Sequence, residues 1–176
     1  MMSAADVEYC LDVWERAGIA VWLDGGWGVD ALVGRPTREH DDLDIAIALA
    51  QRESFLDVMR GAGFEVRERE SDVGFVMQDT TGRKVDVHVV DFARTRVNAE
   101  GETVYGGIEY AVGSLDGTGT IGGRPVQCVS AEWAMRYHTR YEPDDDDYRD
   151  VCALSEAFGI PLPPPYDTWA TRPTPR

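Results

Sequence analysis

The strongest constraint on the fold is a short alternating stretch that starts at Asp41. In "DDLDIAI", Asp42 and Asp44 alternate with Leu43 and Ile45. Successive side chains of a strand point to opposite faces, so two carboxylates share one face and two apolar side chains share the other. The apolar face needs a core to cover it, while the acidic face can hold a hard divalent cation. A solvated acidic turn before a strand is the alternative.

A second stretch carries another aspartate among valines. In "KVDVHVV", Asp86 and His88 lie on one face, and Val85, Val87 and Val89 lie on the other. An aspartate in such a strand is costly to bury unless it has a partner, such as a metal ion or a reacting hydroxyl group. If this strand lies beside the first acidic strand, three carboxylates converge.

Two glycines stand about sixteen residues before the first acidic strand. In "WLDGGWG", Gly25 and Gly26 follow a predicted strand and open a short helix that reaches about Val33. Glycine lets backbone approach a phosphate closely, and a helix N-terminus offers free N–H groups and the positive end of a dipole. Alone, the pair is also compatible with a simple helix-starting turn. Together with the carboxylates, it favours a metal–nucleotide site.

The order of predicted elements indicates an α+β fold with a mixed, mostly antiparallel sheet covered by helices. We expect helices at about residues 3–17, 25–33, 51–61, 130–137 and 147–158, and strands at 19–24, 43–49, 64–69, 74–79 and 84–90. A hairpin is predicted to turn at Gly122 and Gly123, and residues 92–118 are predicted as loops with short strands. Residues 1–160 then form a single domain, with a helical part at about 130–160. The Pro-rich tail, residues 161–176, is predicted to be extended.

Charge and cysteine content narrow the function classes. The net charge is −15, and Lys84 is the only lysine. This charge disfavours binding to nucleic acid and would attract a metal ion or a cationic small molecule, although it is also compatible with a role in solubility alone. Three scattered cysteines without a C-x-x-C motif fit a reducing cytoplasm. The sequence shows neither a secretory pattern nor a membrane-spanning run, so we expect a cytoplasmic protein without membrane contact.

These motifs in this order are typical of the nucleotidyltransferase superfamily. "WLDGGWGVDALVGRPTREHDDLDI" resembles the core motif of the small antibiotic nucleotidyltransferases, the lincosamide and aminoglycoside-2''-adenylyltransferase group. "KVDVHVV" resembles the strand of their third aspartate, and "CVSAEWAMRYHTRYEPDDDDYRDVCAL" resembles the C-terminal block of the lincosamide type. The resemblance covers most of residues 7–154 but is not clear for residues 92–118. It implies a polymerase-β-like palm core.

The resemblance also implies the main site residues. Asp42 and Asp44 would be metal ligands, Asp86 would be the general base, and a second metal ion could bridge all three. The expected cofactor is one or two Mg²⁺ ions, with ATP or another NTP as co-substrate. The metal would neutralise charge at the α-phosphorus while Asp86 takes a proton from an acceptor hydroxyl, which expels pyrophosphate. Gly25 and Gly26 would bind the nucleotide phosphates.

Weaker candidates surround this set. Arg35 and Arg38 could contact triphosphate oxygens or form salt bridges with neighbours. Tyr141, together with Asp147 and Asp150, comes with the resemblance and would shape the nucleotide or acceptor pocket.

Both histidines near the acidic strands have two interpretations. His88 could be a partner of Asp86 or a structural histidine, and His40 could orient a carboxylate, although we favour a role in capping its loop.

The predicted function is transfer of a nucleoside monophosphate, AMP from ATP, to a hydroxyl group of a small cationic antibiotic. Lincosamides come first and aminoglycosides second, and the role would be antibiotic resistance. One alternative is a protein-directed nucleotidyltransferase of a toxin–antitoxin pair. Another is a non-catalytic nucleotide-binding domain. We expect no nucleic-acid partner, and a homodimer is compatible by analogy alone.

Overall fold

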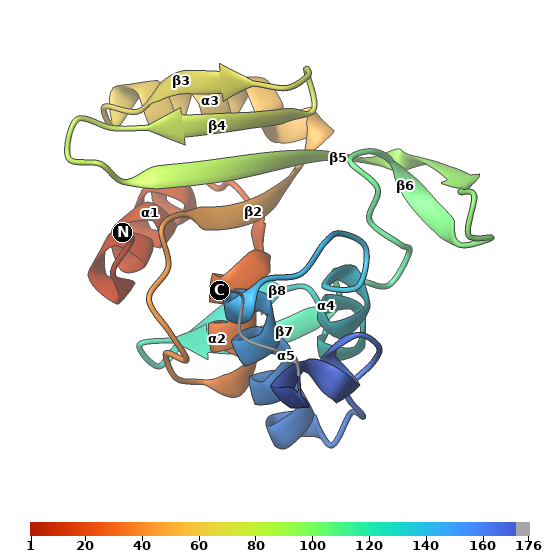
Figure 1. The fold of residues 1–176 in the computed structure, drawn as a ribbon. Coiled ribbons are helices and arrows are strands. Elements are labelled where there is room, and N and C mark those ends of the chain that lie inside the picture. Colours follow the sequence, from red (N-terminus) through yellow and green to blue (C-terminus); the bar gives the residue numbers. More distant parts are fainter. Residues whose placement is uncertain (172–176) are drawn as a thin grey trace.

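The computed structural model describes residues 1–171 and has helices on both sides of one twisted sheet (Figure 1). The helices are α1 (Ala4–Arg16), α2 (Gly25–Val33), α3 (Arg52–Gly61), α4 (Ala131–Tyr137) and α5 (Asp145–Phe158), with two short 3-10 helices, η1 (Leu49–Gln51) and η2 (Tyr166–Thr171). The strands are β1 (Val21–Leu23), β2 (Leu43–Ala48), β3 (Glu65–Arg69), β4 (Gly74–Gln78), β5 (Lys84–Val97), β6 (Thr103–Gly107), β7 (Gly117–Ile121) and β8 (Arg124–Cys128). None of the helices in residues 1–171 has the length and apolar character needed to cross a membrane.

The sheet is mixed and mostly antiparallel, which confirms the predicted fold class. The strand order is β3-β4-β5-β2-β1-β8-β7, and β6 pairs with β5 outside this path. Only the β2–β5 and β1–β8 pairs are parallel among the described strands. The parallel β2–β5 pair places the two acidic strands side by side, as the three-carboxylate prediction requires.

The two faces of the sheet bury separate cores. On one face, α1 and α3 pack against apolar side chains that include Leu43, Ile45 and Val87. On the opposite face, α2, α4 and α5 form a second core that includes Ala46 and Val90. Because Asp44 and Asp86 alternate with the first set along their strands, they point to the second face. The alternation of apolar and acidic residues along β2 and β5 therefore puts the larger core on one face of the sheet and the acidic site on the other.

Local signals explain the helix boundaries near the site. Gly34 ends α2 in the left-handed conformation, with φ of 76°. At the start of α5, the Asp144 side chain accepts hydrogen bonds from the backbone N–H groups of Asp146 and Asp147, and Asp147 completes a capping box. Carboxylates in a first helical turn also stabilise the helix, because they interact favourably with the positive end of its dipole. The acidic run "EPDDDD" is therefore a helix start, two residues earlier than predicted.

Two predictions need correction. β5 does not end near residue 90 but continues to Val97 and pairs with β6, so the two strands form an arm that projects from the sheet (Figure 1). The outer residues of this arm are exposed, so no buried face marked the strand in the sequence. The extended tail is wrong for residues 166–171, which form η2 because Tyr166 is buried and its hydroxyl donates to the His138 carbonyl oxygen at 2.6 Å. Residues 172–176 lie outside the described part.

Close contact between β7 and α2 gives a test of the fold. A Cβ atom at Gly119 would stand 2.2 Å from the Ala31 carbonyl oxygen. Gly119→Ala should therefore push β7 from α2 and lower the free energy of unfolding by about 1–3 kcal/mol, the usual cost of overpacking. The measurement is chemical denaturation of wild type and variant.

Gly61→Ala is the matched control, because the new Cβ would meet no atom within 4 Å and Gly61 lies in a helix. Its stability should equal or slightly exceed that of wild type. Unchanged stability of Gly119→Ala would contradict this packing.

Candidate active site

Four aspartates gather around the ends of the central strands. In the parallel β2–β5 pair, Asp44 stands opposite Asp86. Asp24 follows β1, and its backbone N–H donates to the Asp44 carbonyl oxygen at 2.9 Å. Asp42 precedes β2 by one residue and lies on the same side as Asp44. The sheet register, rather than a flexible loop, therefore brings these carboxylates together.

The carboxylates of Asp44 and Asp86 have few hydrogen-bond donors or positive charges near them. Neither accepts a hydrogen bond from any described residue, and the nearest imidazole nitrogen, Nε2 of His88, is 4.0 Å from Asp86 Oδ1. Burial raises the pKa of Asp44 well above its usual value, and the charges of Asp42, Asp24 and Asp86 raise it further. Burial also raises the pKa of Asp86, against the opposing effect of His88. Both groups thus sit where a cation would stabilise their ionised forms.

One cation already approaches this set. Nζ of Lys84 lies 2.9 Å from Asp42 Oδ2, and this ion pair raises the pKa of Lys84. Lys84 begins β5, so its side chain reaches Asp42 across the parallel strand pair. It lowers the negative potential at Asp44 and Asp86 but makes no ion pair with either.

The donor set fits Mg²⁺ held partly by a nucleotide. Across residues 1–171, no three carboxylate, imidazole or thiol groups are gathered closely enough to hold a metal ion without other ligands. Mg²⁺, however, is usually bound in such sites by one or two carboxylates, with phosphate oxygens and water completing the coordination shell. Asp42 and Asp44 offer such a pair. A ligand bond from Asp86 would require the side chains to move closer.

The two glycines at the start of α2 have different neighbours. Gly25 has φ of +52°, and a Cβ atom there would stand 2.2 Å from Asp44 Oδ2. A Cβ atom at Gly26 would instead stand 2.3 Å from Nδ1 of His40. Gly25 therefore leaves room for an aspartate of the site, and Gly26 leaves room for the loop before β2. The N-terminus of α2 lies directly against Asp44.

His40 holds this loop in place. Its Nε2 atom is 2.7 Å from Asp30 Oδ2, and both side chains are almost fully buried. The other Asp30 oxygen accepts a 2.8 Å hydrogen bond from the backbone N–H of Thr37. This pairing agrees with a structural role for His40, since the ring faces α2.

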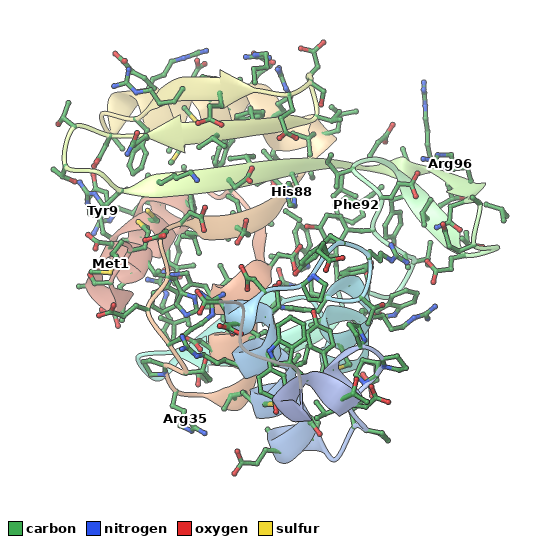
Figure 2. All side chains as sticks on the ribbon, in the orientation of Figure 1. Met1, Tyr9, Arg35, His88, Phe92 and Arg96 are labelled. Atoms are coloured by element: carbon green, nitrogen blue, oxygen red, sulfur yellow. The ribbon has the colours of Figure 1, made fainter. Side chains whose placement is uncertain are left out.

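The two arginines of the loop have separate environments. Arg38 makes a bidentate ion pair with buried Asp150, with Nε 3.0 Å from Oδ1 and Nη2 2.8 Å from Oδ2. Although burial acts to raise the pKa of Asp150, His138, whose Nε2 lies 3.7 Å from Oδ2, and the hydrogen bonds from Arg38 hold it below its usual value. Arg35 is exposed and lies at the lower edge of the molecule in Figure 2. The structure thus brings Arg38, but not Arg35, into a network that joins the loop to α5.

A cleft connects Asp42 with the start of α5. It has a volume of about 610 Å³, and carboxylates dominate its lining: Glu39, Asp41, Asp42, Asp144, Asp146 and Asp147, with Arg38 and Arg149. Tyr141 is half exposed, and its hydroxyl donates to Asp147 Oδ1 at 2.7 Å. The C-terminal block therefore faces the first acidic motif across a negatively charged space.

Sequence reasoning missed two residues of this site. Asp24, within the quoted glycine motif, accepts a hydrogen bond from the hydroxyl of Tyr110, and that hydroxyl is 2.7 Å from Nδ1 of His88. Tyr110 lies in the segment that resembles no known motif clearly, so no sequence signal marked it. The sequence does carry a signal for Asp24, because it is an acidic residue directly before the two glycines.

Comparison with known proteins identifies the group. The sequence profile described as aminoglycoside-2''-adenylyltransferase matches residues 6–154. A lincosamide resistance protein from Staphylococcus haemolyticus is 26% identical over 147 residues, covering 81% of this chain and 88% of that protein. A 2''-aminoglycoside nucleotidyltransferase from Escherichia coli is 30% identical over 137 residues, covering 75% of this chain and 72% of that protein.

Solved structures share the fold. The lincosamide antibiotic adenylyltransferase LnuA, solved with lincomycin, has a TM-score of 0.75 at 23% identity and covers 89% of this chain and 98% of its own. ANT(2'')-Ia, solved with adenylyl-2''-tobramycin, has a TM-score of 0.68 at 25% identity and covers 87% of each chain. With the profile match over most of its length, the chain belongs to the aminoglycoside-2''-adenylyltransferase family and is a nucleotidyltransferase.

Proposed function

We propose that the protein transfers AMP from Mg²⁺-bound ATP to a hydroxyl group of a small cationic antibiotic and releases pyrophosphate. The observation that carries this proposal is the pairing of Asp44 with Asp86 on adjacent strands, without a hydrogen bond to either carboxylate among the described residues. Such a pair suits one carboxylate that helps hold a metal–nucleotide and another that receives a proton. The named relatives, a lincosamide resistance protein and a 2''-aminoglycoside nucleotidyltransferase, support this reaction class.

The three carboxylates have two proposed roles, metal binding and proton acceptance. Asp42 and Asp44 would hold Mg²⁺ together with phosphate oxygens, and the ion would neutralise charge that develops at the α-phosphorus. Asp86 would accept the proton of the attacking hydroxyl, and its raised pKa brings it closer to the operating pH of a general base. Backbone N–H groups at the start of α2, near Gly25 and Gly26, would contact the phosphates. Tyr141 would border the bound nucleotide or acceptor.

The acidic cleft supports a substrate with amino groups. Its carboxylates would attract an ammonium group, and Arg38 is engaged with Asp150 rather than free in the cleft. Lincosamides remain the first acceptor class, because the lincosamide resistance protein is matched over 88% of its length. Aminoglycosides are second. The test is a panel of labelled NTPs with both classes and Mg²⁺, with mass spectrometry of the products.

The same panel separates the alternatives. A protein-directed enzyme would label a partner protein and no antibiotic, whereas a non-catalytic domain would bind Mg²⁺–ATP without forming any product. Light scattering on the same samples would show whether the protein is a homodimer, which the sequence analysis leaves open.

Replacing the proposed base gives the sharpest functional prediction. Asp86→Asn keeps the size of the side chain but cannot accept the proton, so turnover should fall by about 10²–10⁴-fold. Mg²⁺–ATP affinity, measured by calorimetry on the same preparation, should remain because Asp42 and Asp44 are intact. Parallel loss of affinity and turnover would instead make Asp86 mainly a metal ligand. Wild-type turnover would contradict both roles.

The Arg38–Asp150 pair predicts a stability effect. Arg38→Met leaves a carboxylate that is 1% exposed without its bidentate partner, so the free energy of unfolding should fall by about 3–5 kcal/mol. Denaturant unfolding measures this loss. Arg35→Met is the control, since exposed Arg35 makes no ion pair within residues 1–171 and its loss should change stability little. If Arg38→Met keeps full stability but loses Mg²⁺–ATP affinity, Arg38 is a triphosphate contact instead.

A further inference from the structure

A second cavity, distinct from the acidic cleft, lies along one face of α2. Trp27, Asp30 and Gly34 of its lining recur at helical spacing, and the rest of the lining comes from the loop after α2, the β7–β8 turn and the start of α1. Its volume is about 300 Å³, at the lower end of the range for small-molecule sites. Among the described residues, none lines both this cavity and the acidic cleft. A molecule bound here would therefore leave the cleft open.

The cavity wall is largely apolar, and its one carboxylate is already engaged. Asp30 is 1% exposed, and its Oδ2 atom is 2.7 Å from Nε2 of His40. Its Oδ1 atom accepts a 2.8 Å hydrogen bond from the backbone N–H of Thr37. The apolar side chains of the lining are Ala4, Trp27, Pro36 and Ile121. These surfaces would bury the body of a hydrophobic ligand.

Trp27 brings a buried donor without a partner to this lining. The side chain is 4% exposed, and its ring centroid lies 4.8 Å from that of the His40 imidazole. Its Nε1 atom is buried and has no hydrogen-bond partner within residues 1–171. An indole N–H can only donate, and leaving such a donor unpaired in the interior is destabilising. A ligand that places an acceptor oxygen beside Nε1 would satisfy it.

Arg35 gives the same lining a positive charge that no carboxylate neutralises. It is the only arginine within residues 1–171 that makes no ion pair, although the chain has 32 acidic residues and 17 basic ones. Its side chain is exposed at the lower edge of the molecule in Figure 2. A guanidinium without a carboxylate neighbour favours an anionic group, which the acidic surfaces elsewhere on the chain would repel.

We propose that this cavity binds a small apolar molecule that carries a carboxylate group. The apolar body would pack against Trp27 and Ile121, one carboxylate oxygen would accept from Trp27 Nε1–H, and the carboxylate would pair with Arg35. Arg35 can turn toward it because its side chain is long and no ion pair holds it elsewhere among the described residues. One ligand group would thus satisfy the buried donor and the unpaired cation together. Binding here does not require nucleotidyl transfer.

The first test uses benzoate, an aromatic carboxylate, with the full-length protein. The chain has five tryptophans, so five indole N–H signals are expected in the ¹H–¹⁵N NMR spectrum, and Trp27→Phe assigns the signal of Trp27. Benzoate should shift the Trp27 signal saturably and leave the other four almost unchanged. Absence of a saturable shift at Trp27, or an equal shift of all five signals, would overturn the proposal.

Benzamide tests the preference for a carboxylate, because it keeps the ring and an acceptor oxygen but has no charge. Wild type should bind benzoate about two- to fivefold more tightly than benzamide, as expected for an exposed ion pair. Arg35→Met should remove this difference. Arg94→Met, which removes an arginine whose side chain is 84% exposed on the β5–β6 arm, should keep it. Equal affinities of wild type for the two probes would contradict an anionic ligand.

A cavity-filling variant tests the location without changing Trp27. Thr120 lines the cavity from β7, so Thr120→Ile would occupy part of its volume, and isoleucine suits a strand. Affinity for benzoate should fall by roughly tenfold or more, the order of cost of overpacking. Thr118→Ile makes the same change on the same strand outside the lining and should bind benzoate as wild type does. If both variants keep wild-type affinity, benzoate binds elsewhere and the proposal fails.

Discussion

Repulsion between carboxylates on one face of a sheet is the constraint on which the site depends. Parallel pairing of β2 with β5 puts Asp44 opposite Asp86, and Asp24 and Asp42 add charge around them. The sheet holds these groups together because the opposite face of the same strands is packed with Leu43 and its apolar neighbours. A folded core thus opposes the repulsion, and a bound cation would relieve it.

The surrounding elements keep this arrangement rigid. α2 starts beside Asp44 because Gly25 leaves space for that carboxylate, while the loop before β2 is fixed by the Asp30–His40 pair. Arg38 and Asp150 then tie the loop to α5, whose acidic start borders the cleft. The site is therefore supported by buried polar pairs that connect segments far apart in the sequence.

The sequence predicted what alternation and turn chemistry can encode. Strands β2 and β5 followed from side-chain periodicity, α2 from the glycines that open it, and the mixed sheet from the order of the predicted elements. The outer half of β5 did not, because exposed strand residues lack an apolar face. Tyr110 could not be predicted from the sequence either, because it contacts Asp24 and His88, which are distant in the sequence. The Arg38–Asp150 contact joins positions too distant for local patterns to reveal, although a salt bridge for Arg38 was one of the two predicted interpretations.

The most direct test is the unfolding temperature of wild type and Asp44→Asn, with and without Mg²⁺ plus a non-hydrolysable ATP analogue. Because the pKa of Asp44 is raised in the folded state, its contribution to stability declines as pH rises through that pKa. Above that pKa and without metal, Asp44→Asn should therefore be at least as stable as wild type. Metal–nucleotide should raise the unfolding temperature of wild type far more than that of the variant. An equal increase in both proteins would contradict a metal–nucleotide role for Asp44.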